Sequence, residues 1–265
     1  MKQDQDTTLK VFDLKPRRDQ AVKPAELIQI TGHQALTLNA RRSITILWHN
    51  AHMQGVAEGK DYTIEIDDLK PDDHKGYEMV EEAIEALMST ILILRLPNGK
   101  TRRVQFLGGN DLDDPDRPSG VLNYSFDKRL VEILQDSAIW GKISIPVLMA
   151  FSSKYSVSLY EHISQWTGLT RKSFQDLTLN EFRELLGIEK EKYKAFGALN
   201  KHVVKPTVLE LNALASFMSF FIQTRQPPTG LALAVGLLAL TNSLIGAWLT
   251  WRLWNDPPER TDDQP

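Results

Sequence analysis

Apolar residues recur at helical spacing in the first part of the chain, and this periodicity predicts two helices. The clearer case is a set of residues three and four positions apart, Leu36, Ala40, Ile44, Leu47 and Ala51. Residues at this spacing lie on one face of an α-helix, so we expect a helix over 37–54, capped by Thr37 or Asn39. A second amphipathic helix is expected over 77–89, with several Glu side chains outward.

Alternating positions and turn residues predict β-structure around these helices. Residues 62–66 alternate as a strand does, and the segments ILILRL and TRRVQFL flank Pro97-Asn98-Gly99-Lys100. Because Asn-Gly is preferred in two-residue type I′ turns, 91–107 is expected to form a β-hairpin. A strand VLNYSF, a short helix over 127–135 and the apolar stretch ISIPVLMAF follow.

The pattern becomes helical again from Ser152. Residues 178–181, with the sequence TLNE, form a capping box, in which the Thr hydroxyl and the Glu carboxylate satisfy backbone N–H groups at the start of a helix. We expect that short helix to stop at Gly187. A further helix is expected from near Glu191 past Val203.

The order of these elements indicates an α+β protein with two small units, roughly 26–140 and 141–225, after a flexible polar arm over 1–25.

The chain has 265 residues, 42% of them hydrophobic and 25% charged, as in ordinary soluble globular proteins. The absence of cysteine excludes a disulfide scaffold, a zinc ribbon and a thiol nucleophile. A net charge of −3 and a mean hydropathy of −0.29 indicate neither a nucleic-acid binder nor a membrane protein.

Positive charge nevertheless collects in residues 171–205, where eight Lys and Arg stand against five Asp and Glu, a local sum of +3. There is no acidic residue from Lys192 to Lys205. On a continuous helix, Lys194, Lys201 and Lys205 fall in one narrow sector, opposite an apolar face. Alone, such a helix is typical of a solvated lysine face, but after a short capped helix it matches a helix-turn-helix unit.

A second basic feature surrounds the expected hairpin. Its members are Arg95, Lys100, Arg102 and Arg103. They are arranged as in the wing of a winged helix. Taken alone, this pattern is equally consistent with an ordinary exposed hairpin.

Motifs for catalysis and metal binding are incomplete. Gly99-Lys100-Thr101 resembles the end of a P-loop, but the glycine which that motif requires at position 94 is Leu94. His49 and His52 have no third ligand nearby, and the acidic loop 111–116 lacks the glycine and the terminal Glu of a calcium loop. We therefore expect no enzyme activity, no cofactor and no metal.

Four segments together resemble one family of DNA-binding proteins. They are LTLNARRSITILWHNAHMQGV, SKYSVSLYEHISQWTGL, LTLNEFRELLGI and YKAFGALNKHVVKPTVLELNALASF. They are similar to plasmid replication initiators of the iteron-binding RepA/RepB type, over about 25–217. The resemblance implies two tandem winged-helix domains that bind repeated sequences (iterons) in double-stranded origin DNA. It also implies an autoregulatory dimer through the first domain, and recruitment of the host replication initiator and helicase.

The resemblance also implies where DNA binds. The helix after Gly187 corresponds to the recognition helix of the second winged domain. Its candidate phosphate or groove contacts are Lys192, Lys194, Lys201 and Lys205, with Asn200 and His202 as weaker candidates for base edges. The hairpin at Asn98-Gly99 corresponds to the first wing, with backbone contacts from Lys100, Arg102 and Arg103.

The chain departs from the family after LNALASF, where a basic second wing would follow. No charged residue occurs from Gly230 to Trp251, a run long enough to span a bilayer. Three tryptophans and an arginine near its end are typical of a membrane interface, namely Trp248, Trp251, Trp254 and Arg252. The distribution of basic residues around this run would leave the large domain in the cytoplasm.

Three interpretations of residues 226–265 stay open. An altered reading frame has replaced the second wing, so that 141–225 is an incomplete winged domain. Alternatively, a transmembrane helix over 230–251 anchors the chain, or an apolar helix is buried in a further domain. The first function that we expect is initiation of plasmid replication through iterons. The alternative is a membrane-tethered or truncated initiator remnant that acts by pairing with proteins. We expect a cytoplasmic protein, associated with the membrane if the tail inserts.

Overall fold

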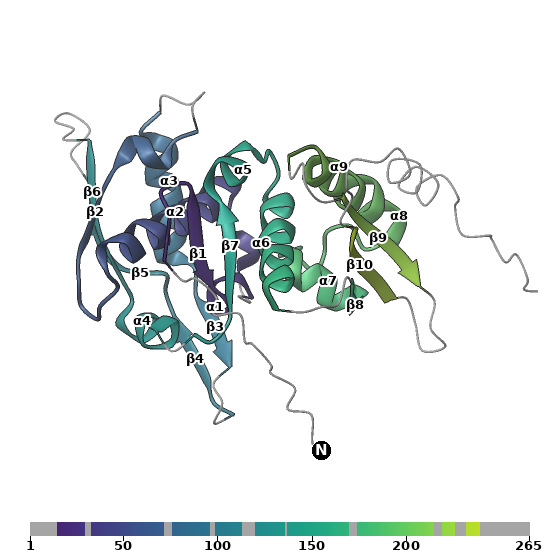
Figure 1. The fold of residues 1–265 in the computed structure, drawn as a ribbon, viewed down its shortest axis with the longest axis horizontal. Coiled ribbons are helices and arrows are strands. Elements are labelled where there is room, and N and C mark those ends of the chain that lie inside the picture. Colours follow the sequence, from purple (N-terminus) through teal and green to yellow (C-terminus); the bar gives the residue numbers. More distant parts are fainter. Residues whose placement is uncertain are drawn as a thin grey trace, which may run out of the picture.

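The computed structural model describes residues 15–29, 33–71, 76–95, 99–112, 120–135, 137–169, 174–214, 219–225 and 232–238. These residues form two mixed helix-and-strand domains that lie on either side of helix α6 (Lys154–Leu169) (Figure 1). One hydrophobic cluster lies within the first domain, and a second joins the helices of the second domain to Ala21, Ile143 and Leu148.

The first domain is organised around helix α2 (Leu38–Gln54). Thr37 caps it, since its hydroxyl accepts a hydrogen bond from the N–H of Ala40, which confirms the expected start of this helix. The other elements, in chain order, are β1 (Gln20–Pro24), α1 (Ala25–Ile28), η1 (His33–Ala35), β2 (Tyr62–Glu65), η2 (Ile66–Leu69), α3 (Glu78–Ser89), β3 (Leu92–Arg95), β4 (Thr101–Val104), β5 (Leu107–Asp111), β6 (Val121–Phe126), α4 (Lys128–Gln135), β7 (Trp140–Ser144) and α5 (Ile145–Ala150).

Three small antiparallel sheets surround α2, in the orders β2-β6-β5, β3-β4 and β1-β7. The buried ring of Trp48 packs 5.9 Å from that of Phe126, and its Nε1 donates to the carbonyl of Val22 on β1 at 2.8 Å. Strand β1 lies within the range that we expected to be a flexible arm. That expectation is wrong for these residues, because pairing with β7 satisfies the β1 backbone and buries Ala21 and Val22.

The expected hairpin is present as β3 and β4, whose register pairs Arg95 with Thr101. Residues 96–98, which include the first residue of the expected type I′ turn, lie outside the described residues, so the type of this turn stays a prediction. Gly99 has a φ of 77°, a left-handed conformation that glycine adopts without steric cost.

The second domain packs a helix-turn-helix against α6. Its elements are β8 (Phe174–Thr178), α7 (Leu179–Leu186), α8 (Phe196–Leu199), the π-helix η3 (Asn200–Val204), α9 (Lys205–Leu214), β9 (Ser219–Arg225) and β10 (Ala232–Leu238). Phe182, Leu199 and Val203 are buried in the same cluster as Leu159 and Ile163 of α6. Hairpin β9–β10 follows the last helix directly, as β3–β4 follows α3 in the first domain (Figure 1).

Strand β10 corrects the interpretation of the apolar tail. Residues 232–238 form the central strand of the sheet β8-β10-β9, where we expected the first part of a helix over 230–251. Ala232 pairs with Thr178 on one side and with Arg225 on the other. A strand with partners on both sides is commonly apolar, so composition alone does not distinguish it from a membrane segment. The second domain therefore has a wing hairpin, and the expectation of an incomplete wing is wrong.

The remainder of the expected span, 239–251, lies outside the described residues. Among the helices of the described part of the chain, none combines the length and the apolarity that crossing a membrane requires.

Candidate nucleic-acid interface

The turn between α7 and α8 is held in shape by one guanidinium group. Helix α7 begins at the predicted capping box of Thr178 and Glu181 and ends at Gly187, which is left-handed with a φ of 66°. From within this helix, Arg183 donates to the carbonyls of Tyr193 at 2.9 Å and Glu189 at 3.1 Å. It also donates to the carbonyls of Lys190 and Lys192. The fork of donors on arginine suits this task, because several carbonyls converge on one plane.

Tyr193 adopts a conformation that is costly for a residue with a side chain. Its φ is 51°, and it is the one non-glycine residue with a positive φ among those described. The bond from Arg183 to its carbonyl and the stacking of its ring on His202, with centroids 5.8 Å apart, hold this conformation. Backbone strain of this kind occurs mostly at functional sites. Lys192 and Lys194 flank this residue and are exposed.

The second helix of the unit begins later than predicted. Ala195 is its extended N-cap residue and Phe196 its first residue, whereas we expected a start near Glu191. Lys194 therefore lies in the turn, and the prediction that it shares a helix face with Lys201 and Lys205 is wrong. The sequence pattern missed this because the turn is held by tertiary hydrogen bonds from Arg183.

Ion pairs connect the turn lysines to neighbouring carboxylates. Lys192 Nζ lies 2.7 Å from Glu189 Oε1, and Lys194 Nζ lies 2.5 Å from Glu191 Oε2. The hydrogen bond from Lys192 lowers the pKa of Glu189 and raises the pKa of Lys192. Exposed pairs of this kind contribute little to stability, so a phosphate can replace the carboxylate at small cost.

Pro206 explains the widened helical turn before it. Proline has no N–H to donate, and its ring collides with the carbonyl four residues earlier in a regular α-helix, here that of His202. In the structure the preceding turn is a π-helix, in which the N–H of Lys205 donates to the carbonyl of Asn200, five residues back. The helix continues through Pro206, and the widened turn rotates the residues before it relative to α9.

The residues of this continuous helix separate clearly by exposure. Lys201, His202 and Lys205 are exposed, Asn200 is half-buried, and Val203 is buried. The second domain thus presents two lysines and a histidine on its helix and three lysines, Lys190, Lys192 and Lys194, on the preceding turn. Ammonium groups in this arrangement can neutralise successive phosphates, and the imidazole and amide can reach base edges.

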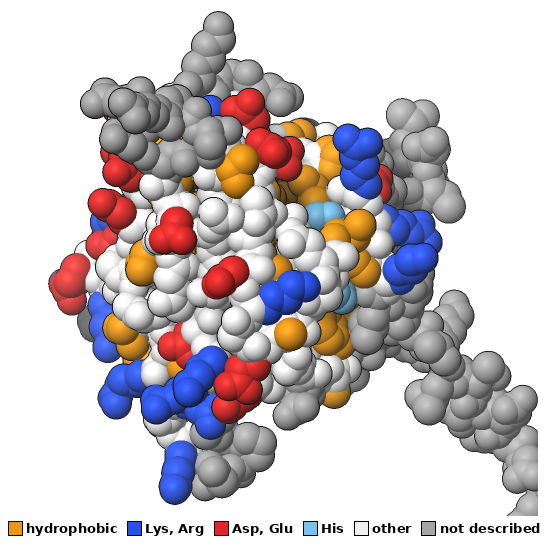
Figure 2. Space-filling model, turned by 90° about the vertical axis from the view of Figure 1, so that its left-hand side faces the viewer, with side chains coloured by type: hydrophobic (Ala, Val, Ile, Leu, Met, Phe, Trp, Pro, Cys, Tyr) orange, Lys and Arg blue, Asp and Glu red, His pale blue; other side chains and the backbone are white. Residues whose placement is uncertain are grey.

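The first domain presents its cations on a different element. Lys100 and Arg103 are exposed on the hairpin. Arg102 is half-buried, because its Nη1 donates to Glu132 Oε2 at 2.8 Å and to the carbonyl of Arg129 at 3.2 Å on α4. This contact attaches the hairpin to α4. Figure 2 shows one group of Lys and Arg at the lower edge of this end of the molecule and others at its right-hand edge.

Helix α4 adds two basic residues that sequence reasoning missed. Lys128 and Arg129 are exposed in its first turn. The positive end of the helix dipole disfavours cations there, and this could have served as a signal of function. The N–H of Arg129 is capped by Asp127 Oδ1 at 2.8 Å, so the turn is well formed despite these charges.

These observations define a tandem winged-helix protein with basic residues on both domains. Two family models match the chain, "Initiator Replication protein, WH1" over residues 20–164 and "Initiator Rep protein, WH2" over residues 178–227. The first model alone covers more than half of the chain. The chain therefore belongs to the family of initiator Rep proteins, which confirms the family resemblance and the two winged-helix domains.

Comparison with one solved structure supports the same fold, and two others match less closely. A crystal structure of the Pi initiator protein in complex with iteron DNA matches with a TM-score of 0.66 and 17% identity, covering 84% of this chain and 98% of that one. Domains 2 and 3 of RctB match with a TM-score of 0.45, 11% identity, and 78% and 81% coverage. The WH1 domain of MSBI1.176, a replication protein isolated from a multiple sclerosis patient, matches with a TM-score of 0.30, 13% identity, and 38% and 82% coverage. No curated protein matches the chain by sequence.

The contacts of individual residues with DNA stay predictions. They concern Lys192, Lys194, Asn200, Lys201, His202 and Lys205 in the second domain and Lys100, Arg102 and Arg103 in the first. The structure brings each group together on its own domain, with Lys194 moved to the turn and Arg102 attached to α4.

Proposed function

We propose that this chain initiates plasmid replication by binding repeated sequences in double-stranded origin DNA. Membership of the initiator Rep family carries this proposal. The similar Pi initiator protein was solved with iteron DNA, and the present chain has the same tandem fold with exposed basic residues on both domains. Its action is by binding and not by catalysis.

In this proposal the second domain reads sequence. Its helix enters the major groove, where Lys201 and Lys205 bind phosphates and His202 faces base edges. The turn lysines bind the adjacent backbone, and hairpin β9–β10 lies alongside. The first domain adds backbone contacts through its hairpin and the first turn of α4, whose exposed cations are Lys100, Arg103, Lys128 and Arg129.

The remaining partners are extensions of this proposal. A second copy pairs through the first domain for autoregulation, and the host initiator and helicase assemble on the bound origin in the cytoplasm. The membrane-tethered alternative depended on an apolar helix over 230–251, and strand β10 occupies the first part of that range.

The test is selection of duplexes bound by the full chain from a random-sequence DNA pool, followed by affinity measurements on the selected sequence. We expect one selected sequence with two blocks of specified base pairs, one read at base edges by the second domain and one selected through DNA shape by the backbone contacts of the first. Binding should weaken steeply with salt, with a slope of about −4 or steeper in log K against log salt if four lysines each neutralise one phosphate. Selection of no common sequence, or affinity independent of salt, would contradict the proposal.

A further inference from the structure

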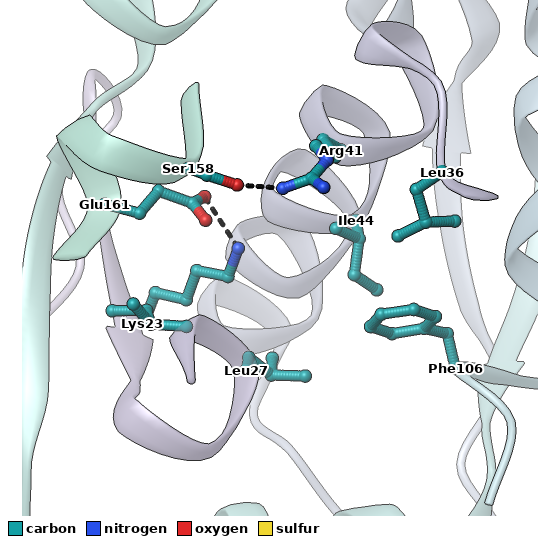
Figure 3. Close-up of a pocket in the computed structure, with 9 residues that line it drawn as sticks. Lys23, Leu27, Leu36, Arg41, Ile44, Phe106, Ser158 and Glu161 are labelled. Atoms are coloured by element: carbon teal, nitrogen blue, oxygen red, sulfur yellow. Dashed lines mark hydrogen bonds and ion pairs between the residues drawn. The ribbon is translucent and has the colours of Figure 1, made fainter. Parts of the chain in front are cut away.

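Three charged side chains are buried where the first domain meets α6 (Figure 3). Lys23 on β1 is 1% exposed, while Arg41 on α2 and Glu161 on α6 are each 6% exposed. Lys23 Nζ donates to Glu161 Oε1 at 2.6 Å and to Thr45 Oγ1 at 2.9 Å. Thr45 in turn donates to the same carboxylate oxygen at 2.8 Å. The carboxylate of Glu161 thereby joins β1, α2 and α6.

Arg41 extends this network into the second domain. One Nη donates to Ser158 Oγ on α6, and the other lies 3.4 Å from the carbonyl of Leu186, the last residue of α7. A single guanidinium group therefore bonds to both α6 and the helix-turn-helix. We refer to Lys23, Arg41, Thr45, Ser158 and Glu161 as the buried polar network.

Other polar contacts follow the same boundary. Lys154 Nζ donates to the carbonyl of Gln34 at 2.9 Å, and Gln29 donates to Gln165 at 3.1 Å. The chains also approach closely, since a Cβ at Gly141 would lie 2.9 Å from a methyl group of Ile28 and 3.3 Å from the backbone nitrogen of Gln165. The first domain thus holds α6 in one position along its axis.

The opposite face of α6 is apolar and packs in a cluster with the helix-turn-helix. Leu159 and Ile163 share a buried cluster with Phe182, Leu199 and Val203 of the two helices of the helix-turn-helix. Because close-packed apolar side chains transmit displacement, the position of α6 determines the position of the DNA-reading helix. The first domain therefore orients that helix through the buried polar network.

Burying these charges is a costly way to stabilise an interface. Desolvation lowers the pKa of Lys23 and lowers the pKa of Arg41 to about 10, although Glu161 opposes both shifts. Well-packed apolar residues often stabilise as much as a buried ion pair or more. Hydrogen-bonded charges are satisfied in a narrower range of geometries than apolar contacts, which have no directional requirement. What this network provides is a defined orientation.

We propose that Lys23, Arg41 and Glu161 are positioning residues that fix the angle between the two winged domains, and so the spacing between the two blocks of base pairs that the domains contact. This inference rests on the proposed function for its DNA consequence. Adding one base pair between the blocks moves them ~3.4 Å apart along the duplex and rotates one by ~34°. A rigid pair of domains cannot follow that change.

The first arm of the test uses no DNA. Because the chain has no cysteine, a Glu82→Cys, Glu184→Cys variant accepts two spin labels, one on each domain. Both parent residues are exposed. We expect a narrow inter-label distance distribution in this background, and a clearly wider one once Lys23→Met, Arg41→Met and Glu161→Met are added. An equally narrow distribution in that folded variant would overturn the inference, whether or not the chain binds DNA.

The second arm uses the selected duplex with one or two base pairs inserted or deleted between its blocks. The original chain should lose about tenfold or more in affinity per changed base pair, whereas the triple Met variant should vary by less than about threefold. Lys70→Met is the matched control, since it removes an ion pair with Asp67 at a distance from α6 and should keep the steep dependence. A steep dependence in the triple variant would contradict the inference.

A milder variant tests the inference if the triple Met variant does not fold. Arg41→Lys keeps the charge but cannot bond to both Ser158 and Leu186, since lysine lacks the fork of arginine. Circular dichroism checks its fold. We expect an intermediate width of the distance distribution and an intermediate spacing dependence. Behaviour identical to the original chain in both arms would overturn the role of Arg41.

Discussion

The two winged domains have the same order of helix and hairpin but opposite charge on the helix. Helix α3, which precedes β3–β4, carries four exposed Glu and no Lys or Arg, namely Glu78, Glu81, Glu82 and Glu85. Helix α8–α9, which precedes β9–β10, exposes Lys201, His202 and Lys205, and its only acidic residue is Glu210. Since DNA presents a dense row of negative charges, α3 is repelled where α8–α9 is attracted.

This difference teaches that the fold does not decide which helix reads DNA. In the first domain, exposed cations gather on the β3–β4 hairpin and in the first turn of α4, away from the helix that would be the reading helix in a conventional winged domain. We infer that the first domain contacts the backbone with its hairpin and leaves α3 to face away from DNA. In this proposal the two domains present different elements to DNA, because the second domain uses its helix at base edges and the first uses its hairpin at the backbone.

The largest effect should come from reversing charge on the second-domain helix. The variant Lys201→Glu, Lys205→Glu loses two phosphate contacts and adds repulsion, so affinity for the selected duplex should fall about 100-fold and the salt slope by ~2. Fluorescence anisotropy over a salt series measures both. Lys15→Glu, Lys70→Glu changes net charge equally elsewhere and should alter affinity by less than about threefold. An equal loss in both variants would mean that net charge, not this helix, governs binding.

Acid should act on the helix that the two domains share. His162 is buried on α6, with Nδ1 2.8 Å from the carbonyl of Ser158, and burial lowers its pKa from 6.5 to about 4. Between these values the unfolded chain binds more protons than the folded one, so stability falls as pH falls. The free energy of unfolding should decrease by about 3 kcal/mol between pH 7 and pH 4 from this residue.

Urea unfolding at several pH values measures this contribution. The matched variant His162→Gln keeps a polar side chain of similar size but does not titrate. Its free energy of unfolding should change less over the same pH range than that of the original chain. Identical pH profiles would show that His162 is not the group that couples protonation to folding.

How much of this was predictable from sequence differs between the two domains. Helix α2, the capping box of α7 and its stop at Gly187 depend on residues adjacent in sequence, and all three were predicted. The start of α8 was not, because Arg183 holds the turn from ten residues away. The burial of Lys23 was missed too, since its partner Glu161 lies 138 residues further along. Strand β10 was mistaken for a helix because an apolar run does not show which strands pair with it. Its partners β8 and β9 supply the hydrogen bonds that make it a strand.

A smaller loss of binding should follow disruption of the turn. Arg183→Met removes the donors that hold the carbonyls between Glu189 and Tyr193, so the turn lysines lose their fixed positions. Affinity should fall about tenfold, while the salt slope changes by less than one because Arg183 itself is not a phosphate contact. Arg183→Lys should bind almost as weakly, since its ammonium group cannot bond to several carbonyls in one plane. Full affinity in the Lys variant would show that charge alone suffices.

The smallest effect should come from the acidic helix of the first domain. Glu81→Gln, Glu82→Gln, Glu85→Gln removes three negative charges from α3 without changing side-chain size. If α3 faces away from DNA, affinity should rise by less than about threefold, since surface charges beyond a Debye length are largely screened at physiological salt. The comparison variant Arg103→Gln, Lys128→Gln should lose about tenfold by the same anisotropy assay. A rise of tenfold or more in the Glu variant would place α3 beside the phosphates, and the two domains would then approach DNA in the same way.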